Sequence, residues 1–234
     1  SSDLSERIIK RKSRKKLILF FDEIQWMAAG RDKLLSLLKY YWDNHWKQKN
    51  IMLILCGSMA SFMVKKILSS KALYGRIHLE ILLKGLIPNE ASQIFLSKRS
   101  NEEMLQYFLV FGTVPKYLEE IDLNKSFNQN MNKMCFSSNC IMINEIERIF
   151  YSHFRETHTY LKIVHLLKQG IFSLKEIGKR LNILSGGGLK QYLQNLEIAE
   201  IIRSYIPFDR NINSKFRKYT LSDEYLIFYF RYIE

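Results

Sequence analysis

Two short apolar runs constrain the fold of the first third of the chain more than any other feature. Residues 17–21 (LILFF) and 51–56 (IMLILC) contain no charged or strongly polar side chain, as is typical of parallel strands buried on both faces. Between them apolar residues recur at helical spacing, namely Leu34, Leu35, Leu38, Tyr41, Trp42 and Trp46. A strand, a helix and a second strand predict an α/β fold with neighbouring parallel strands, covered by helices on both faces.

The rest of the chain carries helical patterns and then hairpin patterns. Residues 101–111 and 141–150 have helical periodicity, and Pro115 is expected to start a helix. Three further helices are expected within residues 161–167, 174–181 and 189–196, followed by two strands, 201–206 and 216–221, around a polar turn. This order predicts a winged helix-turn-helix. We therefore expect an α/β segment over residues 1–87, a helical lid or connector over 88–156 and a winged helix over 157–234.

The charge balance favours a polyanionic partner. The formal net charge is +13, and residues 7–16 alone hold seven Lys or Arg. Nucleic acid or nucleotide are partners of this kind, although a composition rich in Lys, Ile and Asn, as AT-rich genomes produce, raises the charge without any such partner. The basic run itself is either a nucleic-acid contact or a solvated approach to the first strand.

Other features exclude some classes of protein. The apolar runs are far shorter than the ~18 residues that cross a bilayer, so no membrane association is expected. Three cysteines, Cys56, Cys135 and Cys140, form no zinc-finger spacing and favour a reducing cytoplasm. The histidines show no i, i+4 pair on a helix, so we expect no zinc site.

Two carboxylates follow the first apolar run directly. Asp22 and Glu23 would lie at the carboxyl edge of the sheet, where open α/β folds bind their ligands. There Asp22 can hold Mg²⁺ through water and Glu23 can polarise an attacking water, as in the Walker B strand of P-loop ATPases. Alternatively, the two carboxylates cap the following helix.

A small hydroxyl follows the second run. Ser58, after Gly57, would stand at the end of the neighbouring strand, where a sensor hydroxyl can contact a γ-phosphate. It can also cap the next helix, and the two roles are compatible.

Taken in order, these and later motifs resemble a family of prokaryotic, especially archaeal, AAA+-like P-loop ATPases called DEXX-box ATPases. The resemblance covers nearly the whole chain from Leu17 and rests on Asp22-Glu23-Ile24-Gln25-Trp26, Cys56-Gly57-Ser58 with Ser61-Phe62-Met63, Leu73-Tyr74-Gly75-Arg76, Gly112-Thr113-Val114-Pro115-Lys116-Tyr117-Leu118, Ser222-Asp223-Glu224-Tyr225-Leu226 and Phe228-Tyr229-Phe230-Arg231. It implies ATP and Mg²⁺ as ligands, with Asp22 at the metal position, Glu23 as catalytic base and Ser58 as sensor. Arg76 matches the family's candidate for a charge-stabilising arginine, the alternative being a surface salt bridge.

Two departures from the family pattern matter. The 234 residues contain no G-x-x-x-x-G-K-[ST] phosphate-binding loop, and Gly112-Thr113 stands where the family usually has two glycines. The nucleotide site is therefore expected to be incomplete here and to need an N-terminal ATPase segment or a protein partner. The resemblance implies the C-terminal portion of an ATP-binding and hydrolysing regulator. The alternative is a non-catalytic winged-helix protein that binds DNA or docks on a protein.

The expected recognition helix opens with Gly186, Gly187 and Gly188. Glycines supply no side chain to read bases. The remaining candidates for DNA contact are Lys190, Gln191 and Gln194 on this helix and Arg210, Lys215, Arg217 and Lys218 on the wing. DNA contact through backbone charge and docking on a protein both stay open.

Overall fold

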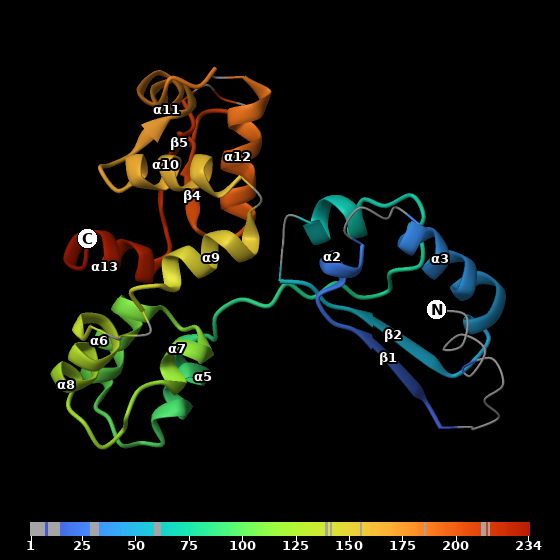
Figure 1. Cartoon of the computed structure of the whole chain (residues 1–234), viewed down its shortest axis with the longest axis horizontal. Helices are drawn as coiled ribbons and strands as arrows, with labels where there is room; N and C mark the ends of the chain where they lie inside the picture. Colours follow the sequence, from blue (N-terminus) through green and yellow to red (C-terminus); the bar gives the residue numbers. More distant parts are fainter. Residues whose placement is uncertain are drawn as a thin grey trace. The chain divides into compact units, whose positions relative to one another are not determined.

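The computed structural model describes residues 8, 15–28, 33–58, 62–138, 140, 142–154, 156–184, 186–211, 214 and 216–234, with only the backbone of Ser152 and His153. Most of the basic run of residues 7–16, together with Ser61, Ser185 and Lys215, lies outside this set. The chain divides into two compact units, Ser1–Glu80 and Ile81–Glu234 (Figure 1). Among the described residues no helix is both long and apolar enough to span a membrane.

Unit 1 is built on the two apolar runs. They form strands β1 (Leu17–Phe21) and β2 (Ile51–Leu55), which pair in parallel with Leu17 opposite Ile51 and Phe21 opposite Leu55. The prediction of neighbouring parallel strands is thus confirmed. The helical segments are α2 (Ile24–Met27), α3 (Lys33–Tyr41), its continuation as a π-helix η1 (Trp42–Trp46), and a second π-helix η2 (Met63–Leu68).

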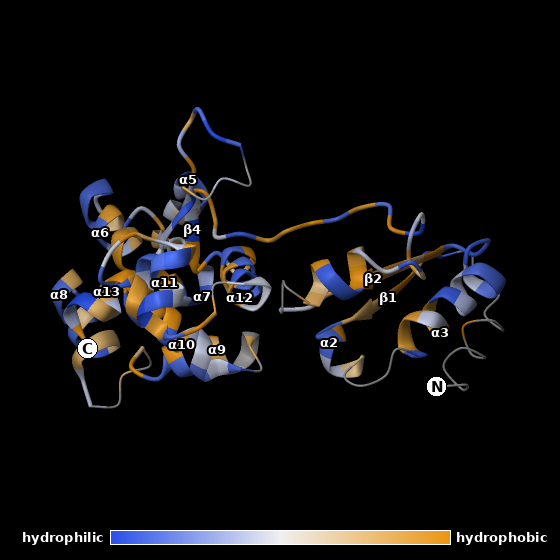
Figure 2. Cartoon of the chain, turned by 90° about the horizontal axis from the view of Figure 1, so that it is seen from above, coloured by the Kyte–Doolittle hydropathy of each residue, from blue (hydrophilic) through white to orange (hydrophobic). Residues whose placement is uncertain are grey.

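The described segments cover one face of this sheet and leave side chains of the other face exposed. Leu17, Leu19 and Phe21 pack with their β2 neighbours against a core formed by Ile24, Leu38, Trp46, Ile67 and Leu73. On the opposite face Ile18 is 57% exposed, Phe20 58% and Met52 43%. The orange colour of β1 and β2 in Figure 2 shows that the residues of both strands are hydrophobic. For the part of unit 1 that the structure describes, the prediction of helices on both faces was therefore wrong. A continuous apolar run indicates that burial of both faces of the strand is favourable. It does not identify the segments, of this chain or of another, that cover each face.

The first part of unit 2 is helical. It contains α5 (Pro88–Ser92), η3 (Gln93–Phe95), α6 (Asn101–Phe111), α7 (Pro115–Glu119), α8 (Phe127–Met131), η4 (Asn132–Phe136) and α9 (Glu145–His153). The predicted helix at 101–111 and the start at Pro115 are confirmed. The helix predicted from residue 141 begins only at Glu145; residues 142–144 form a turn in which the Glu145 N–H donates to the Met142 carbonyl.

The second part of unit 2 combines three helices with a small antiparallel sheet. The helices α10 (Thr157–Leu167), α11 (Leu174–Leu181) and α12 (Gly187–Ile198) occur where they were expected. Strands β4 (Ile202–Tyr205) and β5 (Lys218–Leu221) are antiparallel, and β3 (Phe172–Ser173), which was not predicted, makes the strand order β3-β5-β4. Helix α13 (Glu224–Tyr232) follows.

Both parts of unit 2 share one hydrophobic core. Fully buried side chains come from the helical part, such as Phe95 and Phe111, and from the later helices, such as Ile163 and Leu193. Helix α13 packs on α6, and the ring of Tyr225 lies 5.8 Å from that of Tyr117. The motifs around residues 112–118 and 222–226 thus meet in space, although more than 100 residues separate them.

Candidate functional site

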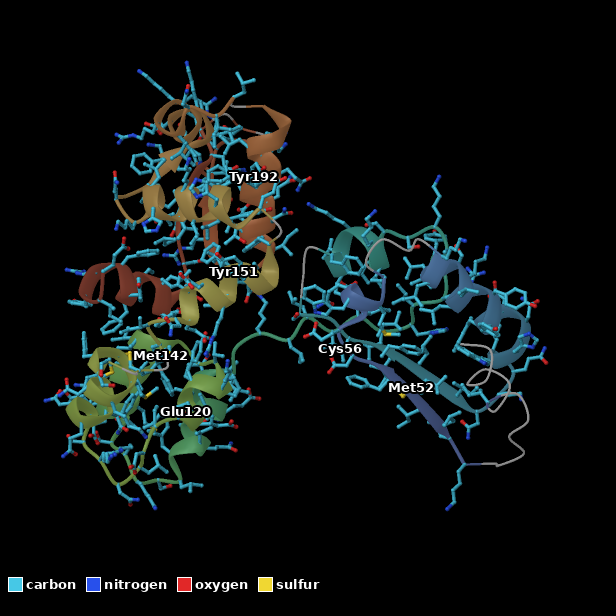
Figure 3. The ribbon with its side chains drawn as sticks, in the orientation of Figure 1. Met52, Cys56, Glu120, Met142, Tyr151 and Tyr192 are labelled. Atoms are coloured by element: carbon cyan, nitrogen blue, oxygen red, sulfur yellow. The ribbon has the colours of Figure 1, made fainter. Side chains whose placement is uncertain are left out.

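The ends of the two parallel strands are joined by backbone hydrogen bonds. The N–H of Cys56 donates to the carbonyl of Phe21 at 2.8 Å, and the N–H of Ile24 donates to the carbonyl of Cys56 at 2.9 Å. Cys56, labelled in Figure 3, lies just beyond the end of β2. The residues that follow each strand are therefore held side by side at the carboxyl edge of the sheet, where parallel sheets bind ligands.

Glu23 and Ser58 are in direct contact at this edge. The Ser58 hydroxyl donates to Glu23 Oε2 at 2.8 Å, and the Ser58 N–H approaches the same oxygen at 3.3 Å. Glu23 has a left-handed backbone with φ 48° and precedes α2, yet its side chain makes no capping hydrogen bond to that helix. The structure thus brings the predicted base and sensor together, whereas it gives no support to helix capping by Glu23.

Gln25 also belongs to this site, although no role was predicted for it. Its amide Nε2 donates to Glu23 Oε2 and, at 3.0 Å, to the Ser58 hydroxyl. The side chain is almost completely buried. Its sequence signal was its place in the motif Asp22-Glu23-Ile24-Gln25-Trp26, which gives no indication of its partners.

Asp22 is exposed beside this group, where its Oδ1 accepts a hydrogen bond from the Glu23 N–H at 3.0 Å. Burial and the neighbouring Asp22 carboxylate raise the pKa of the Cys56 thiol. No group of three or more His, Cys, Asp or Glu that could hold a metal occurs among the described residues. An exposed carboxylate followed by a second one fits Mg²⁺, which keeps several waters and takes its other ligands from substrate phosphates.

Arg76 lies in a bidentate ion pair. Its Nε donates to Asp43 Oδ1 at 2.8 Å and its Nη2 to Asp43 Oδ2 at 2.6 Å, while Nη1 donates to the Tyr74 carbonyl. The hydrogen bond with Arg76 lowers the pKa of Asp43. A cavity of about 410 Å³ adjoins the pair, lined by Trp42, Asp43, Lys47, Gly75, Arg76 and His78. The contacts of Arg76 in the structure are those of a surface salt bridge.

The residues expected to contact DNA have different surroundings. Lys190, Gln191 and Gln194 are exposed on α12, where the Gln191 amide donates to Asn195 Oδ1 at 3.2 Å. Lys218 is exposed on β5. Arg217, in contrast, donates to the Ser204 hydroxyl at 2.5 Å and lies 3.9 Å from Glu197 Oε1. Its guanidinium is therefore engaged within the protein, which makes it a weaker candidate than Lys218.

The chain is similar to known proteins in its sequence and in its fold. Residues 2–121, about half of the chain, match a family described as an ATPase domain predominantly from Archaea. An uncharacterized protein of Methanocaldococcus jannaschii is 30% identical over 217 residues, which is 92% of this chain and 48% of that protein. The chain thus spans about half the length of this curated relative.

Among solved structures, a Walker-type ATPase of Pyrococcus abyssi has a similar fold, with a TM-score of 0.59 at 20% identity. The match covers 98% of this chain and 65% of the other. With a parallel strand pair that ends in two carboxylates and a hydroxyl, and with the family match over its first half, the chain belongs to the family of ATPase domains found predominantly in Archaea.

Proposed function

We propose that this chain is part of an AAA+-like ATP-binding and hydrolysing regulator, with its catalytic groups at the carboxyl edge of the β1-β2 sheet. The observation that carries the proposal is the 2.8 Å hydrogen bond between Ser58 and Glu23, which joins the ends of two adjacent parallel strands. A base and a hydroxyl donor in contact can act on the same phosphate group.

Each residue then has a distinct role. Glu23 accepts the proton of the attacking water, and the Ser58 hydroxyl donates a hydrogen bond to the terminal phosphate. Asp22 would hold a Mg²⁺ ion, which when bound would supply positive charge to the phosphates. Arg76 stabilises charge on the transferring group after leaving Asp43.

The phosphate-binding loop is supplied, in our proposal, by an N-terminal segment or a partner chain, since the 234 residues contain no such loop sequence. A carboxylate base and a metal ligand act only on a phosphate chain that is already held in place. Positioning supplies most of the catalysis in phosphoryl transfer. We therefore expect the 234-residue chain alone neither to bind ATP tightly nor to hydrolyse it.

The test compares this chain with a protein that also contains the phosphate-binding segment. In the longer protein Glu23→Gln should leave ATP binding intact and lower turnover roughly 10²- to 10⁴-fold, because an amide cannot accept the proton. Asp22→Asn should instead weaken the Mg²⁺-dependent part of ATP binding. Robust turnover by the 234-residue chain would refute the supplied-loop proposal, and unchanged turnover in Glu23→Gln would remove Glu23 from the base role.

A second candidate function follows from the later half of unit 2. Helices α10, α11 and α12 with the antiparallel β4 and β5 have the element order of a winged helix. We propose that this part binds the DNA backbone through exposed lysines such as Lys190 and Lys218. Docking of the same surface on another protein is the alternative.

A further inference from the structure

Gln25 closes a triangle of hydrogen bonds with the proposed base and sensor. Its Nε2 donates both to Glu23 Oε2 and to the Ser58 hydroxyl oxygen, and the same hydroxyl donates to Glu23 Oε2 at 2.8 Å. The amide of Gln25, a residue that is 4% exposed, thus contacts both of the other side chains. The triangle links the segment after β1 to the segment after β2.

The other atom of this amide has an unfavourable environment. Oε1 of Gln25 is buried and has no hydrogen-bond partner among the described residues. A buried carbonyl oxygen without a partner destabilises the folded state, and an apolar side chain of the same size avoids that loss. The benefit of glutamine at this position therefore lies in the two hydrogen bonds that Nε2 donates, and not in the environment of Oε1.

Gly57 provides the space for this arrangement. A Cβ atom at position 57 would lie 2.5 Å from Gln25 Oε1 and 2.8 Å from Met63 Sδ. Both distances are shorter than any normal van der Waals contact. The glycine before Ser58 and the glutamine after the carboxylate pair therefore form one structural unit, although 31 residues lie between them in the sequence.

We infer that Gln25 is a positioning residue that keeps Glu23 oriented when Ser58 turns to the phosphate; this inference rests on the proposed ATPase function. The Ser58 hydroxyl has a single proton, which it donates either to Glu23 or to a phosphate oxygen. When it donates to phosphate, Glu23 keeps the hydrogen bond from Gln25. The hydrogen bond from Gln25 Nε2 to Ser58 uses a lone pair of the hydroxyl oxygen. The hydroxyl proton of Ser58 therefore remains available to the phosphate.

The test uses Gln25→Leu in the protein that includes its phosphate-binding segment. Loss of the two hydrogen bonds should lower kcat roughly 10- to 100-fold, the effect of a misplaced catalytic group, with KM and the Kd for Mg²⁺-ATP changed less than about twofold. The thermal midpoint of unit 1 should not fall, since the unpaired carbonyl is removed. Gly57→Ala is an independent variant that retains Gln25 and displaces its amide, and it should reproduce the loss of kcat.

A second measurement separates positioning from a general structural role. In a Glu23→Gln background, Gln25→Leu should lower kcat by less than about twofold further, because residues that act as a unit are not additive. A full-size additional loss there would overturn the inference. So would normal kcat in both Gln25→Leu and Gly57→Ala while Glu23→Gln is impaired. Normal kcat in Glu23→Gln itself would instead refute the proposed function.

Discussion

Single residues in this protein have environments that change their chemistry, and Asp223 is the clearest case outside the candidate site. It precedes α13, where its Oδ1 accepts a hydrogen bond from the Leu226 N–H at 2.7 Å. Burial raises the pKa of Asp223 from 3.8 to about 6, although the hydrogen bonds from Leu226 and Tyr225 oppose the shift. The charged form of this carboxylate is therefore disfavoured in the folded protein.

The raised pKa of Asp223 predicts a pH dependence of stability. Between pH 3.8 and about 6 the folded state binds the proton more tightly than the unfolded state, so the free energy of unfolding falls as the pH rises through this window. Asp223→Asn retains a capping oxygen and cannot ionise. We expect its free energy of unfolding, relative to wild type, to increase by about 1–3 kcal/mol between pH 4 and pH 7.5.

Urea denaturation of both proteins at several pH values measures this difference. Asp209→Asn, at a largely exposed carboxylate, serves as the control and should follow the wild-type curve. If the free energies of unfolding of wild type and Asp223→Asn changed with pH in parallel, the pKa of Asp223 would be the same in the folded and unfolded states.

At the scale of the element, α12 has one buried and one exposed face. Leu189, Leu193 and Leu196 are fully buried, whereas Lys190 and Gln194 are exposed. The glycines at the start of the helix have no atom within 4 Å of where a Cβ would stand. A larger side chain would therefore fit at these positions. As glycines, they offer no side chain that could contact the edge of a base. The exposed face of α12 therefore suits contact with a nucleic-acid backbone better than sequence recognition.

This surface predicts weak and salt-dependent binding of duplex DNA. Fluorescence anisotropy across a salt series should show affinity falling steeply with salt, because each phosphate contact releases counterions. Lys190→Ala and Lys218→Ala should each weaken binding and reduce the slope of log K against log salt by roughly one. Lys162→Ala, an exposed lysine on α10, is the matched control. Undetectable binding at about 50 mM salt would favour docking on a protein.

At the scale of the whole molecule, the two units have separate hydrophobic cores. The core of unit 1 contains Ile24, Leu38 and Trp46, and the core of unit 2 runs from Ala91 to Leu226. The three tryptophans of the chain, Trp26, Trp42 and Trp46, all belong to unit 1. Tryptophan fluorescence therefore reports on unit 1 alone, while far-UV circular dichroism is dominated by the more helical unit 2.

Separate cores predict separate unfolding transitions. Leu193→Ala leaves a cavity in unit 2 and should reduce its free energy of unfolding by about 2–5 kcal/mol. We expect the circular dichroism midpoint in urea to fall while the fluorescence midpoint stays unchanged. Leu184→Ala, at a side chain that is 91% exposed, should change neither. A shared shift of both midpoints would show that the two units unfold as one.

Local pattern was sufficient to predict much of this protein from its sequence. The continuous apolar runs predicted β1 and β2, their separation by a helix predicted parallel pairing, and strand polarity then placed Glu23 beside Ser58. Helical periodicity located α6, α10, α11 and α12, because one buried face repeats every three or four residues. Each of these inferences depends on neighbours in sequence or on the direction of a strand.

Contacts between distant segments were decided only by the tertiary structure. The sequence alone did not reveal that Gln25 reaches Ser58 across the strand ends, that Gly57 makes room for it, or that Asp43 holds Arg76. The exposed face of the β1-β2 sheet was likewise missed, since apolar character does not identify the segment that covers a face. Which side chains contact each other depends on the path of the chain between them. A local repeat of apolar residues does not determine that path.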